Sequence, residues 1–206
     1  MKKNFYIQSY CHIKNQRVSL NGKELFVGDA EDFSDFIKAT YKNLDTQYSK
    51  FFKMDNLSKL AFLAADVLLK HENLETDKDS NIALVFSNRA SSLDTDRKHQ
   101  QSIADPEDYY PSPAVFVYTL PNICLGEISI KHRLYSENSF FIFDGFKADP
   151  LKDYSNSLLR QAKAEKVLCG WVEMDENNYE AFLYLVEKEG EILHNTNEIN
   201  RLYQIL

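Results

Sequence analysis

The feature that most constrains this chain is a short apolar stretch at residues 81–87, with the sequence NIALVFS. Apolar residues that follow one another without polar alternation are typical of a strand that is buried on both faces. Helices must then cover both faces of the sheet. Residues 57–70 supply one of them, because Leu60, Ala64 and Leu68 fall on one face at helical spacing, and Asp55 or Asn56 precedes them as a cap.

Strand and helix patterns alternate along the rest of the chain. Strands are predicted at residues 6–13, 139–144, 166–173 and 179–187, and a small hairpin at 18–26 around Asn21-Gly22. Helices are predicted at residues 114–120, 122–134 and 153–165, with Leu158, Leu159 and Ala162 of the last one buried, and a final helix from the capping pattern at 195–198 to Leu206. This order predicts a single α/β domain over residues 1–206. Its sheet is expected to be mixed, mostly parallel and five-stranded, with helices packed on it and the last hairpin as an antiparallel edge.

Composition and charge exclude several classes of function. The formal net charge is −7, which disfavours nucleic acid as a partner because phosphates would be repelled. No apolar stretch approaches the roughly 20 residues of a membrane helix, and the N-terminus lacks the apolar core of a signal peptide. Cys11, Cys124 and Cys169 are far apart and form no CxxC pair, so buried free thiols in a cytoplasmic protein are expected.

The residues that commonly bind metals or perform catalysis show no strong pattern. The histidines have no i, i+4 or HxH spacing, and Asp94 and Asp96 are best interpreted as solvated loop carboxylates. The adjacent pair Cys11-His12 lies on a predicted strand, where neighbouring side chains point to opposite faces and cannot form a dyad. The sequence therefore predicts no metal and no cofactor.

Several segments, in order along the chain, resemble one known family. Residues 53–61 (KMDNLSKLA) pair Met-Asp with the start of an alanine-containing helix, and residues 82–96 (IALVFSNRASSLDTD) place a strand before a Leu-Asp-Thr-Asp. Residues 109–134 carry a Leu-Pro-Asn before a helix, Ser136-Glu137-Asn138 stands before a strand, and 166–173 (KVLCGWVE) is a further strand. This set resembles the N-terminal half of β-ketoacyl synthases of the thiolase-like fold. It is most similar to short synthase-like proteins of bacterial aryl-polyene and flexirubin pigment clusters.

The resemblance implies a specific place for the nucleophile. In the family a cysteine follows the strand after Gly-Pro-Asn, and counting from Asn138 places that position near Gly145, within Phe143–Lys147, where this chain has no Cys, Ser or Thr. The family's two catalytic histidines belong to its C-terminal half, and we expect a short form without that half. Cys124 is a weak substitute: it follows Pro121 near a predicted helix start, which favours the thiolate, but a buried structural thiol is the simpler interpretation.

The resemblance also implies a dimer seam. In the family the strand before the nucleophile pairs with its mate across a two-fold axis, and here that strand contains Phe140, Phe141, Ile142 and Phe143. A free edge this apolar is an aggregation hazard, so it needs a partner. The helix predicted at 153–165 carries Arg160, Lys163 and Glu165 and is preceded by Lys152, which indicates that the face normally covered by a second half has been made partly polar.

These observations lead to three hypotheses. The first is a non-catalytic synthase-like subunit, a homodimer or a heterodimer with a full-length β-ketoacyl synthase, which stabilises its partner or acts as a chain-length factor in fatty acid, polyketide or aryl-polyene biosynthesis. The second is an active 3-oxoacyl-[acyl-carrier-protein] synthase or acyltransferase that uses a displaced Cys124. The third is a module that binds an acyl-carrier protein or acyl-CoA.

Overall fold

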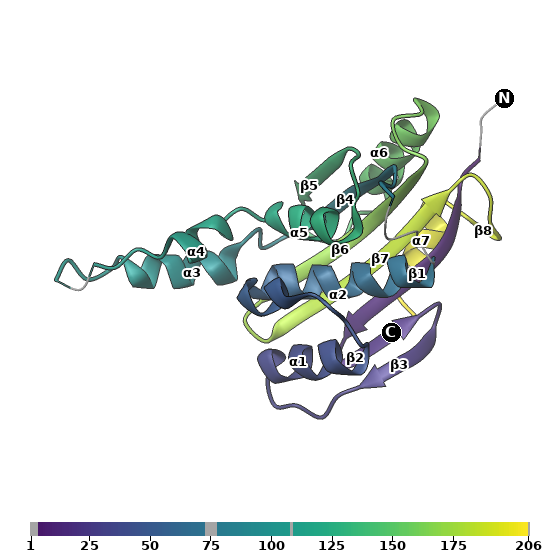
Figure 1. The fold of residues 1–206 in the computed structure, drawn as a ribbon. Helices are drawn as coiled ribbons and strands as arrows, with labels where there is room; N and C mark the ends of the chain where they lie inside the picture. The colour runs from purple at the N-terminus through teal and green to yellow at the C-terminus, as the bar shows by residue number, and fades with distance from the viewer. Residues whose placement is uncertain (1–3, 73–77, 108, 206) are drawn as a thin grey trace.

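The computed structural model describes residues 4–72, 78–107 and 109–205 of the chain. One continuous sheet runs through the molecule, with helices on both sides and a long arm extending beyond one end (Figure 1). The strands are β1 (Tyr6–Lys14), β2 (Arg17–Leu20), β3 (Lys23–Val27), β4 (Ile82–Asn88), β5 (Asn138–Ile142), β6 (Lys166–Asp175), β7 (Asn178–Glu187) and β8 (Ile192–Leu193). The helices are α1 (Phe33–Asn43), the 3-10 helix η1 (Ser49–Lys53), α2 (Asn56–His71), α3 (Leu93–Ser102), α4 (Pro113–Val117), α5 (Ile123–His132), α6 (Ala148–Arg160) and α7 (Thr196–Tyr203).

The sheet has eight strands in the order β3-β2-β1-β7-β6-β4-β5, with β8 paired to β1. The mixed α/β class is confirmed, but the expected strand number and pairing need correction. Only β4–β5 and β4–β6 are parallel pairs, and the others are antiparallel. In the five strands β1, β7, β6, β4 and β5, four nevertheless run in one direction and β7 alone runs against them. The β6–β7 hairpin lies at the centre of the sheet and not at its edge, because both of its strands are buried on both faces.

Helix caps, a hairpin turn and one glycine explain where several helices and strands begin, turn or pack. The side chain of Asp55 accepts a hydrogen bond from the Ser58 amide and caps α2, and Asn195 caps α7 in the same way through the Glu198 amide. Asn21 and Gly22 both have positive φ, as the two-residue hairpin turn requires. Gly170 is needed for close packing, because a Cβ on it would overlap the carbonyl oxygen of Phe182 on the neighbouring strand.

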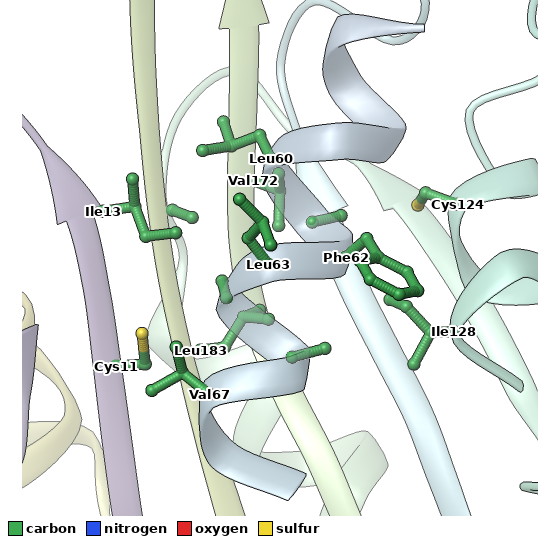
Figure 2. Packing of buried hydrophobic residues seen from close by; sticks show 14 of the residues in the cluster. Cys11, Ile13, Leu60, Phe62, Leu63, Val67, Cys124, Ile128, Val172 and Leu183 are labelled. Carbon is green, nitrogen blue, oxygen red and sulfur yellow. The ribbon is translucent and has the colours of Figure 1, made fainter. Parts of the chain in front are cut away.

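Two apolar layers fill the space on either side of the sheet. On one face the side chains of α2 lie between the sheet and α5: Leu60 and Leu63 point to the strands, and Phe62 points to Ile128 of α5 (Figure 2). On the other face α6 and α7 cover a separate cluster that includes Leu151, Leu159 and Leu202. Because each layer holds many side chains that are removed from water, at roughly 1.5–3 kcal/mol for each large one, both faces contribute to stability.

One helix begins and ends earlier than expected. Helix α6 spans Ala148–Arg160, whereas a helix at 153–165 was predicted. Leu158 and Leu159 are buried as expected, but the prediction for Ala162 is wrong: it is exposed and has positive φ in the turn after the helix. The sequence pattern missed this because the turn contains no glycine to mark the end of the helix.

Candidate functional site

The loop between β5 and α6 occupies the position where the resemblance placed a nucleophile. Strand β5 ends at Ile142, and α6 begins at Ala148 after Lys147, whose side chain makes no capping bond. An added Cβ on Gly145 would meet nothing within 4 Å. The loop therefore has room for a reactive side chain at Gly145, and the sequence provides none.

An aromatic cluster lies directly beside Gly145. The ring of Phe146 stacks on that of Tyr203 with 4.1 Å between centroids, and it meets Phe182 edge-on at 5.8 Å and Trp171 edge-on at 6.2 Å. Tyr203 comes from α7, near the C-terminal end of the described chain, so two segments far apart in sequence pack together here. We call Phe146, Trp171, Phe182 and Tyr203 the aromatic cluster.

A single carboxylate organises the polar rim of the aromatic cluster. Glu180 accepts hydrogen bonds from the Tyr203 hydroxyl at 2.6 Å and from the Trp171 indole nitrogen at 3.1 Å, and it forms an ion pair with Lys14 at 2.7 Å. Burial, reinforced by the neighbouring Glu180 carboxylate, raises the pKa of Tyr203 above its usual range. Tyr203 therefore stays a neutral donor at physiological pH and fixes α7 over the loop.

Two histidines on this face are buried and uncharged. His12 stacks on Phe182 at 4.7 Å between centroids, and desolvation lowers its pKa to about 4. His194 Nδ1 lies 2.9 Å from Asn156 Oδ1, and burial lowers its pKa to about 3. Both histidines are enclosed in packed protein, so they act as part of the core and not as exposed acid–base groups.

Cys124 lies on the opposite face of the sheet from Gly145. It belongs to the layer around α2, whereas Phe146 packs against the layer under α6 and α7, so the structure does not bring the two candidate positions together. Its thiol donates to the Pro121 carbonyl at 3.1 Å and is fully buried, and this desolvation raises its pKa well above the usual value. A group that is buried, protonated and already hydrogen-bonded is a poor nucleophile.

Strand β5 is the open edge of the sheet, because it pairs only with β4. The Glu137 carbonyl and the Phe143 amide bond to β4, so by strand alternation the main-chain groups of Asn138, Phe140 and Ile142 point outward. The phenylalanines are not lined up along this edge. Phe140 packs on the α2 layer, and Phe141 and Phe143 pack on the α6 layer, which leaves Ile142 half exposed at 50%.

Helices α3 and α4 form an arm that extends beyond one end of the sheet (Figure 1). Helix α4 is apolar in sequence (PAVFV), yet none of its residues is buried. Along the arm Tyr110 is 81% exposed, Phe116 59% and Leu120 55%. A small groove of about 280 Å³ between the two helices is lined mainly by apolar side chains. The sequence analysis did not assign a role to this segment, although the run of apolar residues from Pro113 was visible.

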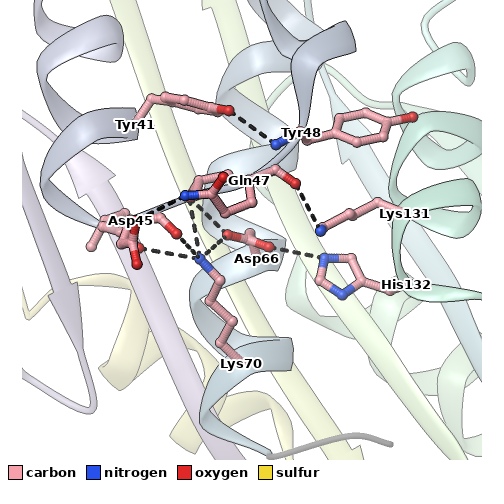
Figure 3. Close-up of polar contacts among 10 residues, drawn as sticks. Tyr41, Asp45, Gln47, Tyr48, Asp66, Lys70, Lys131 and His132 are labelled. Atoms are coloured by element: carbon pink, nitrogen blue, oxygen red, sulfur yellow. Dashed lines mark hydrogen bonds and ion pairs between the residues drawn. The ribbon is translucent and has the colours of Figure 1, made fainter. Parts of the chain in front are cut away.

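Helix α5 and the base of the arm are held to the body by polar contacts around two carboxylates, Glu127 and Asp66. Glu127 of α5 accepts hydrogen bonds from Tyr48 at 2.9 Å and from Tyr118, which follows α4, at 3.1 Å. Asp66, deep in α2, binds His132 at the end of α5, Lys70 and Thr46 (Figure 3). The arm therefore has a fixed base and an uncovered apolar outer part.

The outward side of α6 is polar. Asp149, Asp153 and Arg160 are exposed, and Lys152 forms ion pairs with both aspartates. The large exposed apolar residues found among the described positions include none from this helix. The described outward face of α6 is therefore polar, on a helix that begins and ends earlier than predicted.

The described residues contain no group of three or more metal-binding side chains, and none of their helices has the length and apolar character needed to cross a bilayer.

Comparison with known proteins identifies the fold. No family model matches the chain, and no curated protein sequence matches it. Among solved structures, the ishigamide ketosynthase/chain length factor is similar with a TM-score of 0.64 and 18% identity over 92% of this chain and 64% of the matched one. A type II polyketide synthase acyl-carrier protein in complex with its ketosynthase gives a TM-score of 0.66 and 13% identity over 91% of this chain and 63% of the matched one. A ketosynthase in complex with its chain length factor from Xenorhabdus doucetiae gives a TM-score of 0.55 and 18% identity, over 91% of this chain and 80% of the matched one.

The chain thus spans less than two thirds of the matched chains in the first two structures. At these identities the likeness establishes the fold, and the predicted thiolase-like fold is confirmed.

Proposed function

We propose that this chain is a non-catalytic β-ketoacyl synthase-like subunit that acts as one domain over residues 1–206 and pairs with a full-length β-ketoacyl synthase. The observation that carries the proposal is surface that the described chain leaves uncovered, namely an apolar arm and an unpaired strand edge. Helix α4 has no buried residue, and β5 pairs only with β4 and offers outward main-chain groups. The fold shared with ketosynthases and chain length factors indicates what kind of chain completes this surface.

The energetics favour a partner at this surface. The exposed aromatic and aliphatic side chains of the arm and its base include Leu93, Tyr109, Tyr110, Phe116, Val117 and Leu120. Covering even a few hundred Å² of such surface contributes several kcal/mol, at roughly 25 cal/mol per Å². An antiparallel strand placed against β5 adds hydrogen bonds to the outward groups of Asn138, Phe140 and Ile142.

The lack of catalysis follows from the chemistry of the β5–α6 loop. A condensing enzyme needs a thiolate at a helix start, where the helix dipole lowers the thiol pKa, and donors that stabilise the oxyanion. The family resemblance puts that position near Gly145, and the aromatic cluster lies beside this glycine. The three cysteines, Cys11, Cys124 and Cys169, are buried, and desolvation raises the pKa of each. The alternative of catalysis by a displaced Cys124 is therefore disfavoured.

In this proposal the subunit stabilises the active synthase and, as a chain length factor does, limits the acyl chain that grows in it. The pathway would be of the fatty acid, polyketide or aryl-polyene type, in which an acyl-carrier protein delivers the substrate.

Co-expression with a β-ketoacyl synthase tests the pairing. Native mass spectrometry of the purified complex is expected to show a heterodimer of one chain each. Ile142→Asp places a charge on the exposed strand edge and should abolish the heterodimer, whereas Lys188→Glu, an exposed site after β7, should leave it intact. Recovery of this chain only as a monomer or homodimer beside a folded synthase would contradict the proposal, and acyl-carrier binding by such a homodimer would favour a carrier-binding module.

A further inference from the structure

A break in the strand pairing leaves part of β1 without a neighbour on one edge. On the edge of β1 that faces away from β7, β8 pairs with the first two residues of β1 and β2 pairs with the last four. Between them the main chain of Tyr10 bonds to Asn21, whose amide donates to the Tyr10 carbonyl at 2.8 Å and whose side chain accepts from the Tyr10 amide at 2.9 Å. Gln8 and Ser9 therefore have no strand beside them on this edge within the described chain. The register of the β1–β7 pairing also shifts at Gln8, as in a β-bulge.

A groove of about 680 Å³ lies at this break. Its walls come from β1, from the turn between β2 and β3, and from the end of β7 with the loop that leads to β8. Its volume is in the range of roughly 300–1,000 Å³ that is typical of ligand-binding pockets. We call it the edge groove, and the lining side chains on which its chemistry depends are Gln8, Tyr10, Asn21, Glu187, Glu189 and Glu191.

The edge groove is acidic, and its charge is only partly balanced. Glu187 forms an ion pair with Lys166 at 3.0 Å between Oε2 and Nζ. Glu189 and Glu191 are exposed and make no ion pair within the described part of the chain. None of the described residues that line the groove is Lys, Arg or His, although the exposed Lys188 stands between Glu187 and Glu189 in the sequence. A cationic group in the groove would relieve the repulsion between these carboxylates.

Tyr10 adds an unpaired hydroxyl to the wall of the edge groove. The residue is 8% exposed, and its hydroxyl makes no hydrogen bond to the described residues. Arg201 of α7 is close enough to interact with it electrostatically, but the Arg201 guanidinium is paired with Glu198 at 2.7 Å. Because polar groups that are this buried normally have a hydrogen-bond partner, the free hydroxyl indicates a partner from outside the chain.

We propose that the edge groove binds a short extended peptide segment of another protein that carries Lys or Arg. A main chain placed beside Gln8 and Ser9 fills the break between β8 and β2, as in the addition of a strand to a sheet edge. The basic side chain of the segment then reaches Glu189 and Glu191, and the Tyr10 hydroxyl accepts a hydrogen bond from it. A free polyamine would neutralise the glutamates but would leave the strand edge unpaired, so the groove favours a peptide. This binding is independent of the proposed pairing with a synthase.

Titration of the purified chain with the capped peptide Val-Arg-Val-Arg-Val, followed by calorimetry, tests the assignment. Glu189→Gln/Glu191→Gln should weaken the affinity about fivefold and remove most of its salt dependence, because it removes two charges that face the bound cation. Tyr10→Phe should weaken the affinity about threefold and leave the salt dependence unchanged, because it removes only the hydroxyl. The matched control Glu107→Gln/Glu165→Gln removes two exposed glutamates elsewhere and should bind as wild type does. Circular dichroism of each variant checks that the fold is retained.

Two further ligands separate the contributions of main chain and charge. The same peptide with methylated amide nitrogens keeps its charge but lacks donors for the strand edge, and it should bind clearly more weakly. Spermine carries charge without a peptide main chain and should also bind more weakly. The proposal would be overturned by a folded Glu189→Gln/Glu191→Gln protein with the affinity of the Glu107→Gln/Glu165→Gln control, by spermine or the methylated peptide binding as tightly as the unmodified peptide, or by no measurable binding of the unmodified peptide at millimolar concentration.

Discussion

Replacing Asp66, whose side chain is buried, by asparagine should destabilise the protein substantially. Its side chain is 1% exposed, and its carboxylate lies 2.8 Å from Lys70 Nζ, 3.1 Å from His132 Nε2 and 2.9 Å from the Thr46 hydroxyl (Figure 3). Asparagine has nearly the same shape but no charge. The substitution therefore isolates the charge of the site from its packing.

The expected loss of unfolding free energy depends on how exposed the partners of Asp66 are. Breaking a buried ion pair by removing one partner costs about 3–5 kcal/mol when the other stays buried. Here the Lys70 side chain is 43% exposed and can return to water, while His132 is only 12% exposed. We therefore expect a loss of about 2–3 kcal/mol in unfolding free energy, just below that range. For a domain of this size, that corresponds to a fall in Tm of roughly 5–10 °C.

The destabilisation caused by Asp66→Asn should become smaller as the pH falls. Burial alone would raise the pKa of Asp66, but the contacts from His132 and Lys70 outweigh it and leave the pKa below its ordinary value. The charged carboxylate therefore stabilises the fold at neutral pH, and this stabilisation is lost as the pH falls below about 4 and through the folded-state pKa. Asp66→Asn has no such group, so the difference in unfolding free energy between wild type and variant should shrink from pH 6 to pH 3.

Urea unfolding followed by circular dichroism at several pH values measures this difference. Lys70→Met is the matched comparison, because the Asp66 carboxylate keeps His132 and Thr46 as partners, and we expect it to cost less than Asp66→Asn. The reasoning would be refuted if Asp66→Asn unfolded within experimental error of wild type at pH 7, or if its deficit were the same at pH 3 as at pH 6.

Three further predictions concern the edge strand, the loop and the buried histidine. Ile142→Asp should leave the unfolding free energy of the isolated chain within about 0.5 kcal/mol of wild type, because the side chain is at the surface. Phe140→Asp should unfold the chain, because it places a charge among the apolar side chains around α2. Equal melting curves of the two variants would contradict the side-chain orientations described for β5. Gly145→Cys should fold normally and react rapidly with iodoacetamide at pH 8, while Cys11, Cys124 and Cys169 remain unmodified in the native state. Alkylation of the three natural cysteines, detected by mass spectrometry, would contradict their burial. His194→Gln should flatten the decline in stability between about pH 6.5 and pH 4. The pKa of the buried histidine is lowered to about 3, so its stabilisation is present above the unfolded pKa and is lost as the pH falls; an unchanged pH profile would count against this.

The sequence predicted those parts of the fold that local chemistry determines. The buried strand at 82–88, the capped helix α2 and the Asn21-Gly22 turn follow from apolar runs, a capping carboxylate and a dipeptide with positive φ. It did not predict that the β6–β7 hairpin lies at the centre of the sheet. Strand order depends on which buried faces meet in three dimensions, and residues 166–175 and 178–187 would be equally apolar in either arrangement.

The surroundings of the candidate site also depend on which distant segments meet in three dimensions. The expectation of a nucleophile position near Gly145 depends on a short segment, but the aromatic cluster unites Phe146 with Tyr203 across a long stretch of chain. The apolar composition of α4 was visible, and its exposure was not, because the pattern of a short apolar helix is the same whether it is covered by its own chain or by a partner's.

The central claim, that the chain supports catalysis without performing it, is tested most directly by intact-mass analysis of the purified pair with the synthase during turnover with malonyl and acyl thioesters. We predict acyl adducts on the synthase chain only, and product formation that requires both chains. An acyl adduct on this chain, mapped to Cys124 or to any other residue, would contradict the account.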